Sequence, residues 1–275
     1  MVKYPAAVIC ISVIFYCLSL KEVFPLKEVK NVTGTKNLPT LHYGDLRDTV
    51  YTMQSNFIVV NLRDQKGYLY SRNEAVYEFG ISSGTARLLD GVDTNEGLFV
   101  VQCKLPKWHS EQFDSTLMLN WMGFNHGIGF HALAGNSYYR FLGVKKSSHG
   151  CIRISREDAK HIYERIKLGT PVLVHSGNNA VFISFADSAA INNYKEYSYS
   201  DLVHTLSERY NRLYEGRYFI EPITKIIINK NNVRHDGLPI GNSKMIPEKQ
   251  LILPGTLDYQ YAVQDVLRIK FSMKI

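Results

Sequence analysis

Short β-prone runs, each bounded by turn residues, follow one another between residues 57 and 132 and decide which folds the chain can adopt. Residues 57–62 form one run, Asp64-Gln65-Lys66-Gly67 supplies turn chemistry, and residues 68–70 can return as the second strand of a hairpin. Further strands are expected at residues 75–79, 98–103, 117–122 and 129–132, between clusters of Gly, Asn and Asp. The pattern predicts a mostly β module.

One helix is well signalled inside this module. Ser155 can cap a helix in which Asp158 is the N3 residue, and apolar residues then recur at helical spacing until Gly169-Thr170-Pro171 ends it. Strands expected at residues 172–174 and 181–185 complete the module, which we place at residues 57–185.

The composition shifts to Asn, Tyr and Ser beyond residue 186, where no chemical motif is present. We expect an α+β C-terminal extension over residues 186–275, of unknown role, with a helix at residues 201–214 capped by Ser200. Its expected strands are residues 223–228, 250–253 and 267–273. The extension is either a small appended domain or a segment packed on the first module.

The N-terminus predicts export. Residues 1–20 place Lys3 before an apolar run, the layout of a secretory signal, and the run is shorter than the roughly 20 apolar residues of a comfortable membrane span. No small-x-small cleavage site follows, so a removed signal peptide and an uncleaved anchor in contact with the membrane both remain open. A buried helix of a cytosolic domain is the third alternative. Residues 21–56 collect Pro and Gly without periodicity, which indicates a tether.

Composition excludes several classes of protein. With 45% hydrophobic and 21% charged residues among 275, most of the chain is expected to fold around an apolar core. The net charge is +7, but Lys and Arg are spread along the chain, so we expect no nucleic-acid partner. Of the 4 cysteines, Cys10 and Cys17 lie in the N-terminal apolar run, which leaves too few thiols for a disulfide scaffold.

Cys151 is the cysteine whose neighbours carry chemistry. A free thiol needs a nearby base or positive charge to become a useful nucleophile, and a depressed pKa is the expected mark of such a thiol. His149 shares a face with Cys151 if the segment is extended. His131 ends a predicted strand, and a loop rich in Gly and Asn brings the chain back from it to Ser148.

Two further residues beside Cys151 fit an acyl-transfer site. Gly150 lacks a Cβ and can let a substrate carbonyl approach the backbone N–H groups around Cys151, as an oxyanion hole requires. Arg153 can hold a substrate carboxylate or fix the loop, and the sequence leaves both roles open.

The segment from Gly127 to Arg153 resembles the signature of the L,D-transpeptidases, the YkuD-like catalytic domains of bacterial cell walls. It has a His on a strand and then, after a loop, Ser-His-Gly-Cys-hydrophobic-Arg. The resemblance covers about residues 57–175, because Ile81-Ser82-Ser83-Gly84 and Thr94-Asn95-Glu96-Gly97-Leu98-Phe99 stand where the family has a Ser-x-Gly turn and a Thr-Pro-x-Gly-x-Phe segment. It implies a β-sandwich-like domain with a short helix after the active-site segment.

The sequence departs from the family pattern in two places. Asn95 replaces the usual proline, and Ala132-Leu133 replace the usual Gly-Thr after the histidine. The second departure does little harm, because the group that the resemblance places there, to orient the imidazole, is the main-chain carbonyl of Ala132.

The resemblance also implies roles for the site residues. Cys151 would be the nucleophile and His131 the proton acceptor and donor. His149, Gly150 and Arg153 would shape the oxyanion hole and the stem-peptide pocket, and Ser148 would support the loop.

The implied reaction is acyl transfer on peptidoglycan stem peptides, outside the cytoplasm, in the periplasm or cell envelope. Cys151 would attack the bond between a diamino acid and the terminal D-Ala and form a thioester, which an amine from a second stem or a wall-attached protein resolves. Water in place of the amine would make the protein an L,D-carboxypeptidase. Neither a metal nor an organic cofactor is required.

Other readings of these residues remain open. His126, His131, His149 and Cys151 could bind zinc, although the tight spacings of closed zinc sites are missing. Cys103 could form a disulfide with Cys151, but its apolar neighbours favour packing as a small hydrophobe. A different cysteine peptidase would pair Cys151 with His161, His175, His204 or His235.

Two further expectations concern the groove that would hold the stem peptide. Trp121 and the Tyr138-Tyr139 pair could line it, although aromatic residues in a β-rich domain are more often core. A non-catalytic wall-binding module, with its groove blocked by the extension, is the alternative that involves no chemistry.

Overall fold

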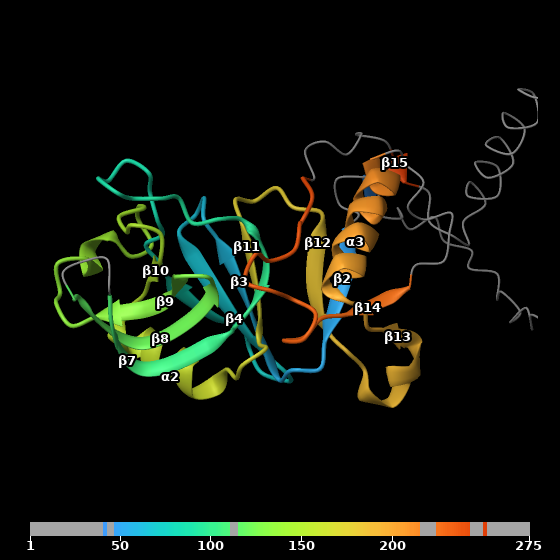
Figure 1. The fold of residues 1–275 in the computed structure, drawn as a ribbon, viewed down its shortest axis with the longest axis horizontal. Helices are drawn as coiled ribbons and strands as arrows, with labels where there is room; N and C mark the ends of the chain where they lie inside the picture. Colours follow the sequence, from blue (N-terminus) through green and yellow to red (C-terminus); the bar gives the residue numbers. More distant parts are fainter. Residues whose placement is uncertain (1–40, 43–46, 111–114, 215–223, 243–249, 252–275) are drawn as a thin grey trace, which may run out of the picture. The chain divides into compact units, whose positions relative to one another are not determined.

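The computed structural model describes residues 41–42, 47–110, 115–214, 224–242 and 250–251, and it is mostly β (Figure 1). This confirms the predicted fold class. The expected signal at residues 1–20 and the strand expected at residues 267–273 lie outside the described residues. Within the described ranges, no helix combines the length and apolar character needed to cross a membrane.

A five-stranded sheet forms the middle layer, in the order β5–β4–β3–β11–β6. These strands are β3 (Asn56–Asn61), β4 (Lys66–Ser71), β5 (Tyr77–Gly80), β6 (Gly97–Val100) and β11 (Pro171–His175). β3 and β4 form the predicted hairpin, and β11 lies parallel to β3. The two apolar strands that are distant in sequence, β3 and β11, therefore lie side by side at its centre.

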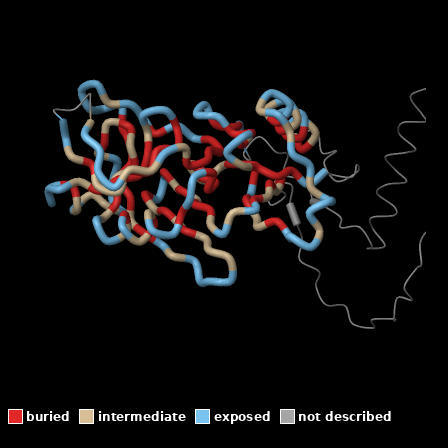
Figure 2. Tube along the Cα trace, turned by 60° about the horizontal axis from the view of Figure 1, so that its bottom comes forward, coloured by how far each residue is buried: buried red, intermediate tan, exposed pale blue. Residues whose placement is uncertain are grey.

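Both faces of this middle sheet are buried. Figure 2 shows buried residues running through the interior of the described chain, with exposed residues at its outer loops. Ile58 and Val60 belong to one hydrophobic cluster, whereas Phe57 and the partly buried Val59 pack in the other. Successive side chains of a strand point to opposite faces, so an unbroken apolar run is what a doubly covered strand requires.

The second sheet carries the residues around Cys151 and has the order β10–β9–β8–β7. Its strands are β7 (Cys103–His109), β8 (Leu117–Asn125), β9 (Ile128–Leu133) and β10 (Ile152–Arg153). Phe124, Phe130 and Ile152 from this sheet share a cluster with Ile58 of the middle sheet and with Ile162 of helix α2 (Arg156–Arg165). The two sheets with their short helix form the expected sandwich-like arrangement.

A third layer covers the other face of the middle sheet. It consists of a sheet in the order β12–β2–β14–β13, together with helix α3. Its elements are β2 (Asp48–Thr52), β12 (Val181–Phe185), the 3₁₀ segment η3 (Ser188–Asn193), β13 (Tyr194–Lys195), α3 (Tyr199–Tyr214) and β14 (Lys225–Ile227). Leu206 of α3 is fully buried in one cluster with Leu98 and Leu173 of the middle sheet. The described part of the extension is thus packed on the first module.

We expected residues 21–56 to form a tether, but part of this segment is built into the fold as strand β2. β2 pairs in parallel with both β12 and β14, and Asp48 at its start is 2% exposed. The Asp48 carboxylate forms an ion pair with the Arg209 guanidinium of α3, with Nε and Oδ2 2.7 Å apart. Before β2 in the chain, β1 (Leu41–His42) pairs antiparallel with β15 (Gln250–Leu251). The segment was missed because its apolar residues are few and its partners lie far away in sequence.

The helix starts follow from capping chemistry. Ser155 Oγ accepts from Asp158 N at 2.9 Å and donates to Asp158 Oδ2 at 2.6 Å, which confirms the predicted cap of α2. For α3 the predicted cap, Ser200, is wrong. Ser198 Oγ accepts from Asp201 N and donates to its carboxylate, which gives the same reciprocal bonding and starts the helix earlier.

The shared core makes a stability prediction. Leu206→Ala removes a fully buried side chain from the cluster that joins α3 to the middle sheet, so the free energy of unfolding should fall by about 2–5 kcal/mol. The whole domain should still melt in one transition at a lower temperature. His204→Ala, on the exposed side of the same helix, is the control and should change stability by less than about 0.5 kcal/mol. An unchanged melting curve for Leu206→Ala would show that α3 is not part of this core.

Candidate active site

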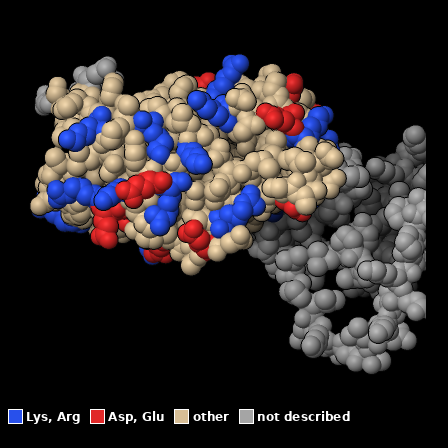
Figure 3. Space-filling model, turned by 90° about the horizontal axis from the view of Figure 1, so that it is seen from below, with Lys and Arg blue, Asp and Glu red and all other residues tan. Residues whose placement is uncertain are grey.

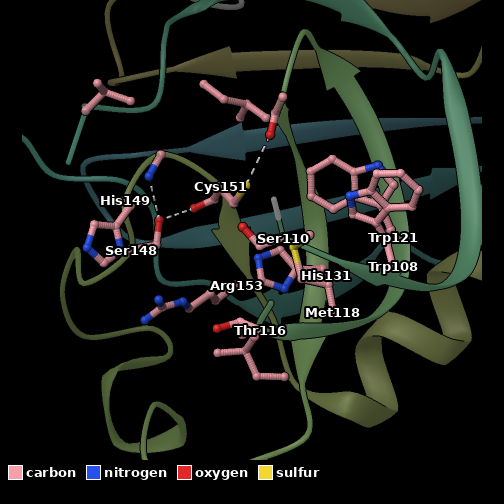
Figure 4. Close-up of a pocket in the computed structure, with 15 residues that line it drawn as sticks. Trp108, Ser110, Thr116, Met118, Trp121, His131, Ser148, His149, Cys151 and Arg153 are labelled. Atoms are coloured by element: carbon pink, nitrogen blue, oxygen red, sulfur yellow. Dashed lines mark hydrogen bonds between the residues drawn. The ribbon is translucent and has the colours of Figure 1, made fainter. Parts of the chain in front are cut away.

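The pairing of β10 with β9 brings the predicted nucleophile and base together. The two strands are parallel, with Ile152 opposite Phe130 and Arg153 opposite His131. Paired residues share a face of a sheet, and so do residues two apart on one strand. Cys151 is therefore on the same face as His131, and Figure 4 shows both side chains in one pocket.

This pocket has a volume of about 760 Å³. Trp108, Met118 and Trp121 line it from β7 and β8, and the loop from Ser148 to Cys151 lines it from the other side (Figure 4). The lining residues are Val92, Trp108, Ser110, Thr116, Met118, Trp121, Gly127, Ile128, His131, Leu133, Ser148, His149, Gly150, Cys151 and Arg153. Four of the five residues predicted to shape the pocket thus line it together with Cys151 and His131, whereas the fifth, Ala132, is buried and does not. None of the lining residues belongs to the C-terminal extension.

His131 is held as a neutral imidazole with a defined tautomer. Its side chain is 4% exposed, and Nδ1 lies 3.2 Å from the carbonyl oxygen of Ala132. A carbonyl can only accept, so Nδ1 carries the proton and Nε2 keeps its lone pair. Burial lowers the pKa of His131 to about 4; the bond to Ala132 opposes this shift and the positive charge of Arg153 adds to it.

The Cys151 thiol is also held neutral. Its Sγ donates to the Gly127 carbonyl oxygen at 3.5 Å. Burial raises the pKa of Cys151 to about 11, although the Gly129 amide and the Arg153 charge both lower it. The depressed pKa that we expected of a reactive thiol is therefore wrong for this pocket, because loss of hydration outweighs the nearby positive charge.

The loop before Cys151 is fixed by Ser148. Its Oγ accepts from Gly150 N at 3.2 Å and donates to the Cys151 carbonyl oxygen. Gly150 has a φ of +147°, and a Cβ there would lie 2.9 Å from Val92 Cγ2. Both the backbone conformation and the space therefore favour glycine directly before the thiol.

The Ser-x-Gly turn lies against this loop. A Cβ on Gly84 would come within 2.5 Å of Gly150 Cα, so the close approach of the two backbones needs glycine. Ser83 O accepts from the backbone N–H groups of Ser147 and Ser148. The segment Ile81-Ser82-Ser83-Gly84, which resembled the Ser-x-Gly turn of the family, thus supports the loop before Cys151.

His149 and Arg153 border the pocket in different ways. Figure 4 shows the His149 ring on the far side of the Cys151 backbone from His131. Arg153 is half-buried and donates from Nη1 to Ser147 O at 3.0 Å, which fixes the loop. Its Nε is buried and has no hydrogen-bond partner in the described chain. Of the two roles left open for Arg153, the contact with the loop is the one present here.

The other histidines lie elsewhere. His161 stacks on Tyr77, with ring centroids 4.1 Å apart, and His175 Nδ1 accepts from Gly177 N. His204 pairs with Glu208. His126 Nε2 lies 2.7 Å from Asp236 Oδ1, and the His126 ring stacks on His235. None of these side chains lines the pocket, so the described structure offers Cys151 no base from the alternative peptidase reading.

Two expectations about cysteine and metal are also resolved in the described residues. Cys103 and Cys151 are both free, and Cys103 is exposed rather than packed as a small hydrophobe. Its Sγ instead accepts from Trp121 Nε1 at 3.2 Å. Across the ranges that the structure describes, no three His, Cys, Asp or Glu side chains are grouped to hold a metal ion.

Sequence reasoning missed the apolar wall of the pocket. Trp108 of β7 faces Met118 of β8 across the hairpin, and both line the pocket with Val92. Trp121 lines it as suggested, but Tyr138 does not: it is 2% exposed and donates to Ile154 O. The sequence analysis named Trp121, which lies within the strand expected at residues 117–122, but not Trp108, which lies outside the expected strands.

Comparisons with known proteins agree with the resemblance. Residues 55–174 match the YkuD family, described as the L,D-transpeptidase catalytic domain. The chain is 30% identical over 126 residues to a protein of Bacillus subtilis (strain 168) that is named "Putative L,D-transpeptidase YciB". That match covers 43% of this chain and 64% of YciB, so the chain spans just under two thirds of its relative.

Solved structures also align with part of the chain. One is an L,D-transpeptidase from Mycobacterium smegmatis, with 18% identity, a TM-score of 0.39 and coverage of 44% of this chain and 58% of that one. Another is an L,D-transpeptidase (Yku) from Stackebrandtia nassauensis, with 21% identity, a TM-score of 0.39 and coverage of 46% and 57%. The family match falls on the residues that build the sandwich and the pocket, so residues 55–174 are similar to the YkuD-family L,D-transpeptidase catalytic domain.

Proposed function

We propose that the protein is a peptidoglycan L,D-transpeptidase that forms cross-links, or attaches proteins to peptidoglycan, through a thioester on Cys151. The observation that carries this is the placement of Cys151 and His131 on one face of paired strands, inside a single pocket. The proposed substrate class is that of the L,D-transpeptidases, to whose catalytic domain residues 55–174 are similar. The site acts outside the cytoplasm, in the periplasm or cell envelope, if residues 1–20 direct export as their sequence suggests.

A neutral thiol and a neutral imidazole set the course of the first step. As Cys151 Sγ attacks the carbonyl carbon between the diamino acid and D-Ala, the thiol proton moves to Nε2 of His131, which is free because Nδ1 donates to Ala132 O. The C–N bond then breaks, and His131 returns the proton to the D-Ala amine. A thioester remains on Cys151 and D-Ala leaves.

The second step reverses these roles. An acceptor amine attacks the thioester carbonyl, His131 takes a proton from that amine, and the sulfur leaves as a thiol once the proton is returned to it. A new amide is formed and the enzyme is regenerated. With water as the acceptor, the same steps release a tripeptide and give an L,D-carboxypeptidase.

The apolar wall supports a peptide-binding role for the pocket. Trp108, Met118 and Trp121 offer surface to the aliphatic parts of a stem peptide. Arg153 also lines the pocket, and its permanent positive charge suits a substrate that brings a carboxylate. The pocket is also not covered by the described part of the extension, as a blocked wall-binding module would require.

Product analysis tests the proposal. We expect the protein, incubated with a purified stem tetrapeptide, to release D-Ala and give a cross-linked dimer detectable by mass spectrometry. Cys151→Ala should abolish both products, because the sulfur is the attacking atom. Cys103→Ser, which removes the other described thiol, should keep them.

Two results would count against the transferase. Release of D-Ala with tripeptide but no dimer would replace it with a carboxypeptidase. No reaction with the wild-type protein, under conditions in which it is folded, would overturn both enzymes in favour of a binding module.

The neutral state of the thiol gives a pH prediction. Because the pKa of Cys151 is about 11, its alkylation by iodoacetamide should be slow at neutral pH and should accelerate steadily as the pH rises above 9. Rates measured peptide by peptide in a mass spectrometer separate Cys151 from Cys103 in the same sample. A fast rate that is constant between pH 5 and 9 would indicate a preformed thiolate–imidazolium pair and contradict the neutral pair.

A further inference from the structure

A single buried hydroxyl, that of Thr94, joins the loop before Cys151 to the Ser-x-Gly turn that contains Gly84. Thr94 is 4% exposed, and its Oγ1 donates to the Gly150 carbonyl oxygen at 2.6 Å. The same oxygen accepts from Gly84 N at 2.9 Å. Thr94 Oγ1 therefore binds the carbonyl of the residue before Cys151. The Thr94 hydroxyl is itself held by Gly84, whose turn lies in close contact with Gly150.

This contact sets the direction of the Cys151 amide. The Gly150 carbonyl and the Cys151 N–H belong to one trans peptide, in which the two groups point in opposite directions. Gly150 and Cys151 line the pocket, whereas Thr94 is buried and does not. Since the carbonyl points inward to Thr94, the Cys151 N–H points toward the pocket.

The neighbouring polar groups are already engaged. Gly150 N donates to Ser148 Oγ, and the Cys151 carbonyl accepts from the same hydroxyl. We expected the backbone N–H groups around Cys151 to form the oxyanion hole. The Gly150 N–H is not free for this role, because it already donates to Ser148 Oγ. Gly150, with its φ of +147° and no Cβ, lacks the steric restraint that would otherwise fix the peptide plane. The bond to Thr94 supplies it.

We infer that Thr94 is a positioning residue for acyl transfer, which locks the Gly150–Cys151 peptide so that the Cys151 N–H meets the oxyanion of the tetrahedral intermediate. The inference rests on the proposed function. When the sulfur attacks, a C–S bond forms, the carbonyl π electrons move to oxygen, and the thiol proton moves to His131. The negative oxygen then needs a donor already aimed at it, because a peptide that must first rotate stabilises it less.

The test compares two reactions of the same thiol. p-Nitrophenyl acetate transfers an acetyl group to Cys151 through an oxyanion and releases p-nitrophenolate, whereas iodoacetamide alkylates the sulfur with no oxyanion at all. We expect Thr94→Val to slow acetylation by about 10- to 100-fold, somewhat less than loss of a whole oxyanion donor, and to leave alkylation within about twofold. Thr94→Ser keeps the hydroxyl and should restore acetylation to within about threefold of wild type.

The matched control is Thr85→Val. Thr85 is a buried threonine of the neighbouring loop, and its Oγ1 accepts from Arg87 N rather than bonding Gly150. This variant should change neither reaction, and thermal melting of each variant checks that it is folded.

Three other outcomes would overturn the inference. Equal losses in both reactions would show that Thr94 supports the loop only, and an unchanged acetylation rate in Thr94→Val would show that it does not set the donor. If the wild-type protein is alkylated but never acetylated, the Cys151 N–H is not placed to bind the oxyanion that forms during acetylation. Acetylation that depends on Thr94, combined with no turnover of the stem peptide, would overturn the proposed function and leave the inference standing.

Discussion

Parallel pairing of β9 with β10 is the constraint on which the whole site depends. The register that puts Arg153 opposite His131 also puts the Cys151 side chain on the His131 face. A slip of one residue would turn Cys151 to the opposite face and leave the imidazole without a nucleophile. The register is stabilised from behind, because Ile152 and Phe130 are both fully buried in the cluster shared with the middle sheet. Packing of the sandwich is thus what aligns the chemistry.

The same packing explains the protonation states. β9 and β10 carry Cys151 and His131 into a pocket that Trp108, Met118 and Trp121 also line, and His131 is 4% exposed there. Burial disfavours both charged forms, lowering the pKa of His131 and raising that of Cys151. In the proposed reaction, the proton therefore moves from Cys151 to His131 during the attack. Arg153 moves the pKa of Cys151 in the direction of a thiolate, but less than burial moves it the other way.

Local chemistry was readable from the sequence, and long-range partners were not. The reciprocal bonds of Ser155 and Asp158 involve neighbours in the chain, and the predicted helix start is correct. Gly150 was recognised as necessary, but its close contact with Gly84 depends on the fold. β2 was mistaken for a tether because Asp48 becomes a core residue only when α3 brings Arg209 to it. The sign of the Cys151 pKa shift was missed for the same reason, since it depends on walls built by β7 and β8.

The central claim is that Cys151 carries the acyl group, and intact-protein mass spectrometry tests it most directly. The wild-type protein is mixed with donor tetrapeptide in the absence of an amine acceptor and quenched in acid at short times. The account predicts an added mass equal to the tetrapeptide minus D-Ala, located on the peptide that contains Cys151 and lost on treatment with hydroxylamine. Turnover of the donor with no such adduct at any time, or the same adduct in Cys151→Ala, would contradict it.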